Sequence, residues 1–179
     1  ATHQCNEDIA LMRTIPGMVV INPADDVEAK AAVEAAYEHV GPVYLRFGRL
    51  AVPVINDNPD YKFELGKAVT LREGTDVTII ASGLTVSESL VAAEKLAADG
   101  INAEVINMHT IKPLDEEAVI KAAAKTGKIV TVEEHSVIGG LGSAVCDVVA
   151  EKAPAKVLKI GVNDTYGESG PAVELIKKY

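Results

Sequence analysis

The chain contains no tryptophan, and aromatic residues make up only 4% of its 179 residues. Its hydrophobic core must therefore consist mainly of alanine, valine, isoleucine and leucine, which suits helices packed on a parallel sheet. No apolar run approaches the ~20 residues that a membrane-spanning helix needs, and no signal or transit peptide is recognisable. We therefore expect a cytoplasmic protein without a membrane partner.

Positive charge is also scarce, because 17 lysines and arginines stand against 26 aspartates and glutamates, for a formal net charge of −9. Without a basic stripe to neutralise phosphates, nucleic acid is not an expected partner. A small phosphorylated substrate is still possible, since it needs only one or two well-placed cations. The two cysteines, Cys5 and Cys146, lie far apart and no residues show metal-ligand spacing. We expect two reduced thiols and no metal site.

Short β-rich runs alternate with alanine-rich helical segments along most of the chain, a pattern typical of an α/β protein with a parallel sheet. Near the N-terminus we expect a helix over 7–15, the strands MVVI and PVYLRF, and between them a helix capped by Asp25 and Glu28. The segment AVPVINDNPD then breaks the pattern with turn-forming residues, and it is the candidate start of an interdomain linker.

A more regular series follows. We expect strands at VTIIAS, NAEVINM, KIVTVEE and KVLKIGV, helices at 85–98, at 115–127 and at GGLGSAVCDVVAEKA, and an edge strand or hairpin in KFELGKAVTLREG. Thr85 and Glu88 are predicted to form a capping box. This part is large enough to fold alone, whereas the two strands and two helices before the linker are marginal for a domain.

Three groups of polar residues are candidates for chemistry. His3 precedes the first helix, and its imidazole could exchange a proton with a substrate hydroxyl group or simply lie on a flexible terminus. Arg46 and Arg49 lie at the C-terminal end of an expected strand, where ligands of open α/β sheets bind. Each guanidinium could bind a phosphate or could form a surface ion pair.

The third group is VEEHSVIGGLGS, in which Glu133, Glu134 and His135 end a strand and glycines open a helix. A helix N-terminus favours anions, and a carboxylate beside a histidine could transfer protons. The glycines match neither the dinucleotide fingerprint nor the P-loop, however. We favour a structural role in close packing for this segment.

Longer stretches of the chain carry a family resemblance. THQCNEDIALMRTIPGMVVINPAD and GPVYLRFGR resemble the latter half of the pyrimidine-binding domain of transketolases, and TIIASGLTVSESLVAAEKLAADGINAEVINMHTIKPLDEE and TVEEHSVIGGLGSAV resemble their C-terminal domain. The likeness is greatest to the C-terminal section of split, two-subunit bacterial transketolases. It implies a partial α/β pyrimidine-binding domain over 1–55, a linker over 56–67, and a three-layer C-terminal domain with a mostly parallel sheet over 68–179.

The resemblance implies a transferase of the pentose phosphate pathway, a dimer that moves a two-carbon ketol unit between sugar phosphates with thiamine diphosphate and Mg or Ca. His3 would be a catalytic and substrate-binding residue near the first hydroxyl group of the donor sugar. Arg49, counted from Pro42, would bind the sugar phosphate. The roles of Arg46 and of the VEEH segment stay open.

In this family the carboxylate that activates the cofactor and the aromatic residue that stacks on it would precede Ala1, and the diphosphate and metal site lies in a different domain. Glu7 follows THQ and does not match the activating glutamate. We therefore expect this chain alone to bind neither cofactor nor metal and to be inactive without an N-terminal transketolase subunit or the missing N-terminal domains.

Two enzymes of the same class remain alternatives: 1-deoxy-xylulose-5-phosphate synthase, whose C-terminal half is similar, and a 2-oxo acid dehydrogenase beta subunit. A third alternative is a non-catalytic assembly module, in which residues 68–179 only mediate subunit contact. A sugar-phosphate acceptor assay would separate the first of these from a transketolase.

Overall fold

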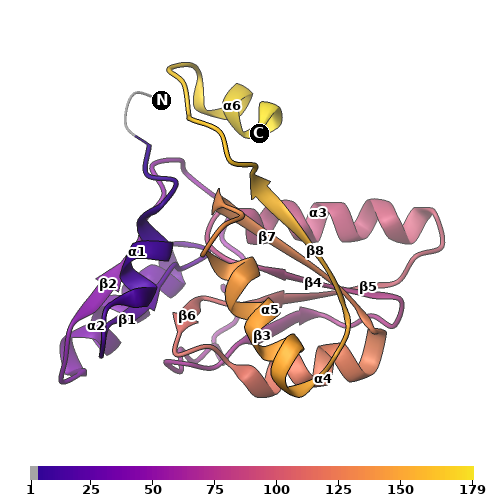
Figure 1. The fold of residues 1–179 in the computed structure, drawn as a ribbon, viewed down its shortest axis with the longest axis horizontal. Helices are drawn as coiled ribbons and strands as arrows, with labels where there is room; N and C mark the ends of the chain where they lie inside the picture. Colours follow the sequence, from indigo (N-terminus) through magenta and orange to yellow (C-terminus); the bar gives the residue numbers. More distant parts are fainter. Residues whose placement is uncertain (1–3) are drawn as a thin grey trace.

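The computed structural model describes residues 4–179 and shows a small N-terminal layer beside a larger sheet that helices cover on both faces (Figure 1). The larger sheet has the strand order β3-β5-β4-β7-β8. Four strands, β4, β5, β7 and β8, are parallel, and the edge strand β3 runs antiparallel to β5. The α/β class and the mostly parallel sheet predicted from the sequence are confirmed.

The bounds of these elements follow the sequence pattern closely. The strands are β3 (Val69–Arg72), β4 (Val77–Ala81), β5 (Ala103–Asn107), β7 (Lys128–Ser136) and β8 (Lys156–Val162), and the covering helices are α3 (Thr85–Ala98), α4 (Glu116–Thr126) and α5 (Leu141–Lys152). Because both faces are covered, central strands such as β5 are buried along their whole length.

Alternate residues of one strand serve two different hydrophobic clusters. Ile80 packs in the cluster that includes Val119 of α4 and Val145 of α5. Ile79 packs instead with Ala93 of α3. Since successive strand residues point to opposite faces, α3 lies on one side of the sheet and α4 and α5 lie on the other (Figure 1).

The N-terminal layer contains α1 (Asp8–Thr14), β1 (Val19–Ile21), α2 (Asp26–Glu38) and β2 (Val43–Leu45). Its sheet has the order β2-β1-β6, in which β6 (Thr110–Lys112) runs antiparallel to β1. The sequence pattern did not predict β6. Two strands alone are marginal in water, and here a strand from a distant part of the chain completes the sheet.

Of the two helix caps predicted from the sequence, the one at Asp25 is confirmed and the one at Thr85 is wrong. Asp25 does cap α2, since its Oδ1 accepts the N–H of Glu28 at 2.8 Å. The capping box at Thr85 and Glu88 is wrong, because Thr85 is already the first residue of α3. The Thr85 hydroxyl instead donates to the carbonyl oxygens of Ser82 and Val132. It joins the start of α3 to β7 rather than closing the helix end.

The chain ends in a tail that returns to the N-terminal segment. After β8 it runs without regular structure to the short helix α6 (Ala172–Lys178), which lies near the start of the described chain in Figure 1. In residues 4–179, no helix has the length and apolar character required to cross a membrane.

Candidate functional site

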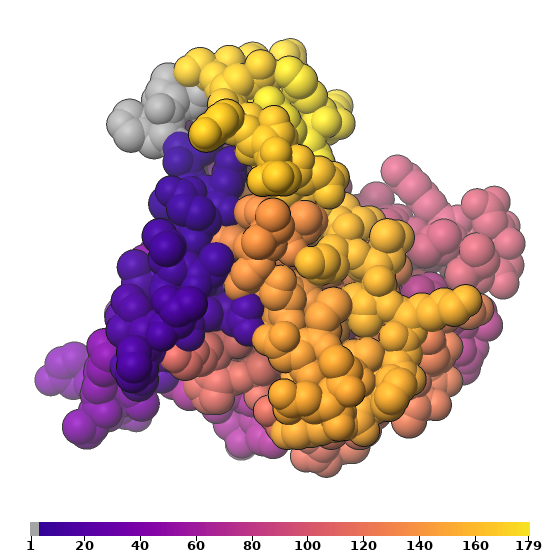
Figure 2. Space-filling model, in the orientation of Figure 1, coloured from indigo at the N-terminus to yellow at the C-terminus, as the bar shows by residue number. Residues whose placement is uncertain are grey.

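The candidate site is a hollow of about 540 Å³ between the N-terminal segment, the end of β2 and the C-terminal tail. Its lining includes Gln4–Asn6, residues 44–50, Glu134, and Gly167, Ala172, Leu175, Ile176 and Tyr179 of the tail. The space-filling view shows the tail next to the N-terminal segment (Figure 2). Gln4 Nε2 donates to the carbonyl oxygen of Glu168 at 2.7 Å, so the two ends of the chain are in direct contact.

Arg49 lines this hollow, as Gln4 does. It is exposed, and within residues 4–179 its guanidinium has neither a hydrogen-bond acceptor nor an ion-pair partner. Because the strand ends at Leu45, Arg49 lies on the loop beyond β2. His3 lies outside the described residues, and its neighbour Gln4 is the part of the THQ motif that the structure places.

Arg46 also lines the hollow, but its donors are bound within the chain. Its Nε donates to Asp8 Oδ2 at 2.9 Å, and its Nη2 donates to the carbonyl oxygens of Cys5 at 3.0 Å and Glu134 at 2.8 Å. A weaker ion pair joins Nη1 to Glu134 Oε2 at 3.4 Å. With its donors used in this way and its side chain 11% exposed, Arg46 holds the N-terminal segment against β7.

Asp8 is the residue that sequence reasoning missed. It is buried, and its Oδ2 also accepts the hydroxyl of Tyr44 at 2.7 Å. Burial and the neighbouring Asp8 carboxylate raise the pKa of Tyr44 to about 12. The sequence contained a sign of such a shared partner, because Tyr44 and Arg46 are two residues apart and so point to the same side of an extended segment.

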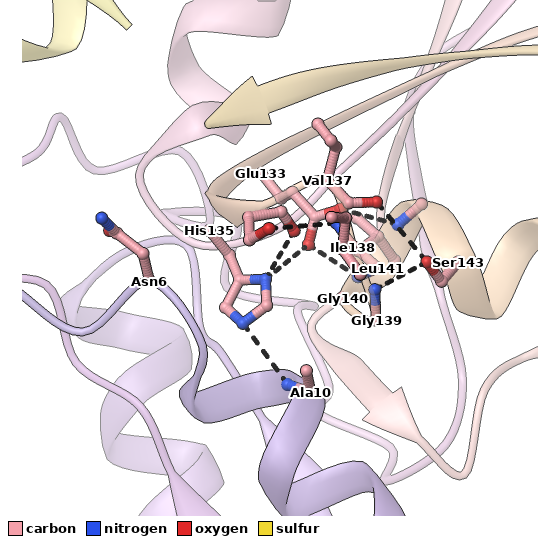
Figure 3. A network of polar contacts seen from close by, with 12 residues as sticks. Asn6, Ala10, Glu133, His135, Val137, Ile138, Gly139, Gly140, Leu141 and Ser143 are labelled. Carbon is pink, nitrogen blue, oxygen red and sulfur yellow. Dashed lines mark hydrogen bonds and ion pairs between the residues drawn. The ribbon is translucent and has the colours of Figure 1, made fainter. Parts of the chain in front are cut away.

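The start of α5, which the sequence left as a possible anion site but favoured as a structural segment, is already occupied from within the chain. The buried Glu133 carboxylate accepts the N–H groups of Leu141 at 2.7 Å and Gly142 at 2.8 Å (Figure 3). Burial raises the pKa of Glu133, and these two N–H groups oppose that shift. A Cβ on Gly140 would collide with the same carboxylate. The amides are therefore not free to bind an external anion.

His135 is fully buried and does not face the hollow. Its Nδ1 lies 2.7 Å from the carbonyl oxygen of Ser136 and 3.6 Å from Glu133 Oε2. Its Nε2 accepts the N–H of Ala10 at 3.3 Å. Neither His135 nor Glu133 can reach a substrate, so this pair does not perform the proton transfer that the motif suggested.

The described residues do not fit a metal or a thiamine diphosphate site. In residues 4–179 no three His, Cys, Asp or Glu side chains are grouped so that they could hold a metal ion. The buried carboxylate of Glu28 accepts from Ala24, Tyr61 and Asn107, and that of Glu133 accepts from the start of α5. Neither is free to contact an aminopyrimidine ring.

Comparisons with known proteins agree with this architecture. The sequence profile of the transketolase C-terminal domain matches residues 66–179, and that of the transketolase pyrimidine-binding domain matches residues 1–54. The 6-deoxy-6-sulfo-D-fructose transketolase subunit of Clostridium sp. (strain MSTE9) is 50% identical over 179 residues, which cover 99% of this chain and 55% of that protein. The 1-deoxy-D-xylulose-5-phosphate synthase of Heliobacterium modesticaldum is 40% identical over 180 residues, covering 99% of this chain and 28% of that enzyme.

A solved structure gives the same result. A split gene transketolase described as an inactive beta4 tetramer superposes with a TM-score of 0.94 at 50% identity, over 99% of this chain and 58% of that one. The chain thus spans about half the length of the transketolase relatives it matches. The resemblance inferred from the sequence is confirmed: the chain belongs to the transketolase family, in which it corresponds to part of the pyrimidine-binding domain followed by the C-terminal domain.

Proposed function

We propose that this chain is part of a thiamine-diphosphate-dependent transketolase that transfers a two-carbon ketol unit between sugar phosphates. The observation that carries the proposal is Arg49, an exposed guanidinium without a partner in residues 4–179, in the lining of the same hollow as Gln4 of the THQ motif. A basic group and Gln4 of the THQ motif in the lining of one hollow suit a phosphorylated polyol.

In this proposal Arg49 binds the phosphate of the sugar in a bidentate manner, and His3 orients the hydroxyl groups near the reacting carbon. Fixing both ends of the substrate favours the reactive geometry, which is a large part of what positioning contributes to rate. We expect thiamine diphosphate, with Mg or Ca, to bind to the other parts of the enzyme. The cofactor would supply the carbanion chemistry.

The proposal includes the partners and the organisation of the chain. Residues 1–55 would form part of the pyrimidine-binding domain, 56–67 the linker and 68–179 the C-terminal domain. An N-terminal transketolase subunit, or further N-terminal domains, would supply the cofactor site, and two such assemblies would form a dimer in the cytoplasm. The pentose phosphate pathway is the proposed setting. The name of one relative includes 6-deoxy-6-sulfo-D-fructose, and this sulfosugar is a further donor to test.

A second candidate function is that of a 1-deoxy-xylulose-5-phosphate synthase. The 40% identity to the Heliobacterium modesticaldum enzyme favours it over a 2-oxo acid dehydrogenase beta subunit or a non-catalytic assembly module. An assay with ketose donors and aldose phosphate acceptors decides between them, because ketol transfer to a sugar phosphate acceptor is specific to a transketolase.

The role of Arg49 can be tested in the complete assembly. Arg49→Ala removes charge-assisted hydrogen bonds to phosphate, so we expect KM for phosphorylated sugars to rise about 10- to 100-fold, with KM for the unphosphorylated sugars nearly unchanged. Arg49→Lys, which keeps the charge but loses the planar fork, should be intermediate. Steady-state kinetics on matched pairs of sugars give the answer.

Lys95→Ala is the matched control, since Lys95 is an exposed cation on α3 and is absent from the lining of the hollow. It should leave both KM values unchanged. An equal rise of KM for phosphorylated and unphosphorylated sugars in Arg49→Ala would remove the phosphate-binding role.

A further inference from the structure

The N-terminal segment that borders the hollow is fixed to the end of β7 by backbone and side-chain contacts. The Ser136 N–H donates to the carbonyl oxygen of Asn6 at 2.8 Å. Arg46 binds the carbonyl oxygen of Cys5 and that of Glu134 at the same time. The position of Gln4–Asn6 at the hollow therefore depends on residues of the larger sheet.

Helix α1 follows this segment directly and lacks a cap of its own. Glu7 holds the N-cap position, but its side chain makes no capping hydrogen bond. The first N–H groups of a helix have no partner within the helix and need an acceptor elsewhere. For Ala10, the third residue of α1, that acceptor is Nε2 of His135, 3.3 Å away on β7 (Figure 3).

The surroundings of His135 decide which ring nitrogen carries the proton. Nδ1 faces the carbonyl oxygen of Ser136 at 2.7 Å, and a carbonyl can only accept, so Nδ1 is the N–H donor. Nε2 must then be the bare nitrogen of a neutral imidazole, which is what the Ala10 N–H requires. Glu133 Oε2, 3.6 Å from Nδ1, favours the same arrangement.

Two glycines of the VEEHSVIGGLGS segment lie so close to the His135 ring and to α1 that a side chain at either position would collide with them. Gly139 has φ +81°, and a Cβ there would lie 2.6 Å from the Cβ of Ala10. A Cβ on Gly140 would lie 2.6 Å from Nδ1 of His135. Arg13, in the last turn of α1, donates to the carbonyl oxygens of both glycines. Helix α1 is thus bound near its start by His135 at the end of β7 and in its last turn by the glycines that follow β7.

We propose that His135 is a positioning residue: its neutral imidazole caps α1 from the larger sheet and so holds Gln4–Asn6 at the rim of the candidate site. The effect on turnover rests on the proposed function. The capping interaction itself does not, and it can be measured on the full chain alone.

The capping interaction is tested by nuclear magnetic resonance on the full chain. In the wild type, the ¹⁵N shifts of His135 should show a protonated Nδ1 and a bare Nε2; a proton on Nε2 would overturn the proposal. His135→Met removes the acceptor, whereas His135→Gln places an amide oxygen near the position of Nε2. We expect amide exchange at Ala10 to accelerate about tenfold in His135→Met and to return near the wild-type rate in His135→Gln.

The positioning role is tested by kinetics in the complete assembly. We expect kcat for ketol transfer to fall about tenfold in His135→Met. The ratio of KM values for phosphorylated and unphosphorylated sugars should stay constant, because Arg49 lies on the loop after β2 and makes no hydrogen bond to α1 in residues 4–179. His135→Gln should recover most of kcat. His39→Met, a histidine at the end of α2, is the matched control and should behave as wild type.

Equal losses in His135→Met and His135→Gln would overturn the acceptor role, and wild-type kcat in both variants would overturn the positioning role. If the wild-type assembly shows no ketol transfer, the proposed function fails. The Ala10 exchange rates and the His135 tautomer still decide whether His135 caps α1.

Discussion

At the residue scale, the N-terminal layer and the larger sheet are joined by buried polar side chains. Glu28 of α2 accepts the N–H of Ala24 at 2.7 Å, the hydroxyl of Tyr61 at 2.7 Å and the side-chain amide of Asn107 on β5 at 2.8 Å. Burial raises the pKa of Glu28, and burial next to that carboxylate raises the pKa of Tyr61. These bonds join α2 to Tyr61 and to β5 and favour one relative placement of the two layers, while Asn107 Oδ1 has no hydrogen-bond partner in residues 4–179.

His109 is a buried residue with an incomplete set of partners. It packs on Phe63 with ring centroids 4.4 Å apart, and its Nδ1 lies 2.9 Å from Thr110 Oγ1, but Nε2 has no hydrogen-bond partner in residues 4–179. Burial lowers the pKa of His109 from 6.5 to about 4. The folded state therefore requires the neutral imidazole.

This pKa shift predicts a loss of stability in acid. A lowered folded-state pKa contributes stability above pH 6.5 that is lost as the pH falls through about 4, by up to ~3 kcal/mol. Urea unfolding of the wild type and His109→Phe between pH 7 and pH 4 measures it. The variant should lack this component, so the stability difference between the two proteins should move in favour of the variant as the pH falls. A difference that is constant with pH would contradict the prediction.

At the element scale, local signals were more reliable than long-range ones, although the local capping box at Thr85 and Glu88 was wrong. The cap at Asp25, the bounds of α3 and the start of α4 near Asp115 depend on residues within a few positions and could be predicted from the sequence. Strand β6 depends on pairing with β1, and Thr85 finds the carbonyl of Val132. Nothing in the neighbouring sequence indicates such partners.

The same distinction applies to the candidate site. Sequence position alone left Arg46 and Arg49 equivalent as phosphate ligands. Both line the hollow, and only the fold shows that Asp8 and Glu134 engage Arg46, whereas Arg49 has no partner in residues 4–179. Likewise, the sequence shows a carboxylate at the strand end and glycines after it. It does not show that the carboxylate of Glu133 accepts the N–H groups of Leu141 and Gly142.

The cap of α4 gives an element-scale prediction. Asp115 accepts the N–H of Ala118 through Oδ1 at 3.1 Å and that of Ala68, just before β3, through Oδ2 at 2.9 Å. Asp115→Ala leaves both donors without this acceptor, and we expect a loss of about 1–2 kcal/mol in the free energy of unfolding. Glu117→Ala, which breaks an exposed pair with Lys121 on the same helix, should leave it nearly unchanged. Similar losses in the two variants, measured by urea unfolding, would show that the cap is not the cause.

At the scale of the whole molecule, the N-terminal layer depends on the larger sheet for its structure. The third strand of its sheet is β6, and its hydrophobic cluster of Val19, Ile21 and Ala32 is covered by Phe63 and Leu65 of the connecting segment. The candidate hollow likewise combines the N-terminal segment with the C-terminal tail. The two matched transketolase regions therefore form one unit in the residues described.

The central claim is that this chain supplies the substrate-binding part of a transketolase and that the cofactor binds elsewhere. Calorimetric titration of thiamine diphosphate with Mg²⁺ tests this claim most directly, first on the chain alone and then on the chain mixed with an N-terminal transketolase section. We predict no saturable binding to the chain alone and saturable binding to the mixture. Micromolar binding to the chain alone would contradict the account.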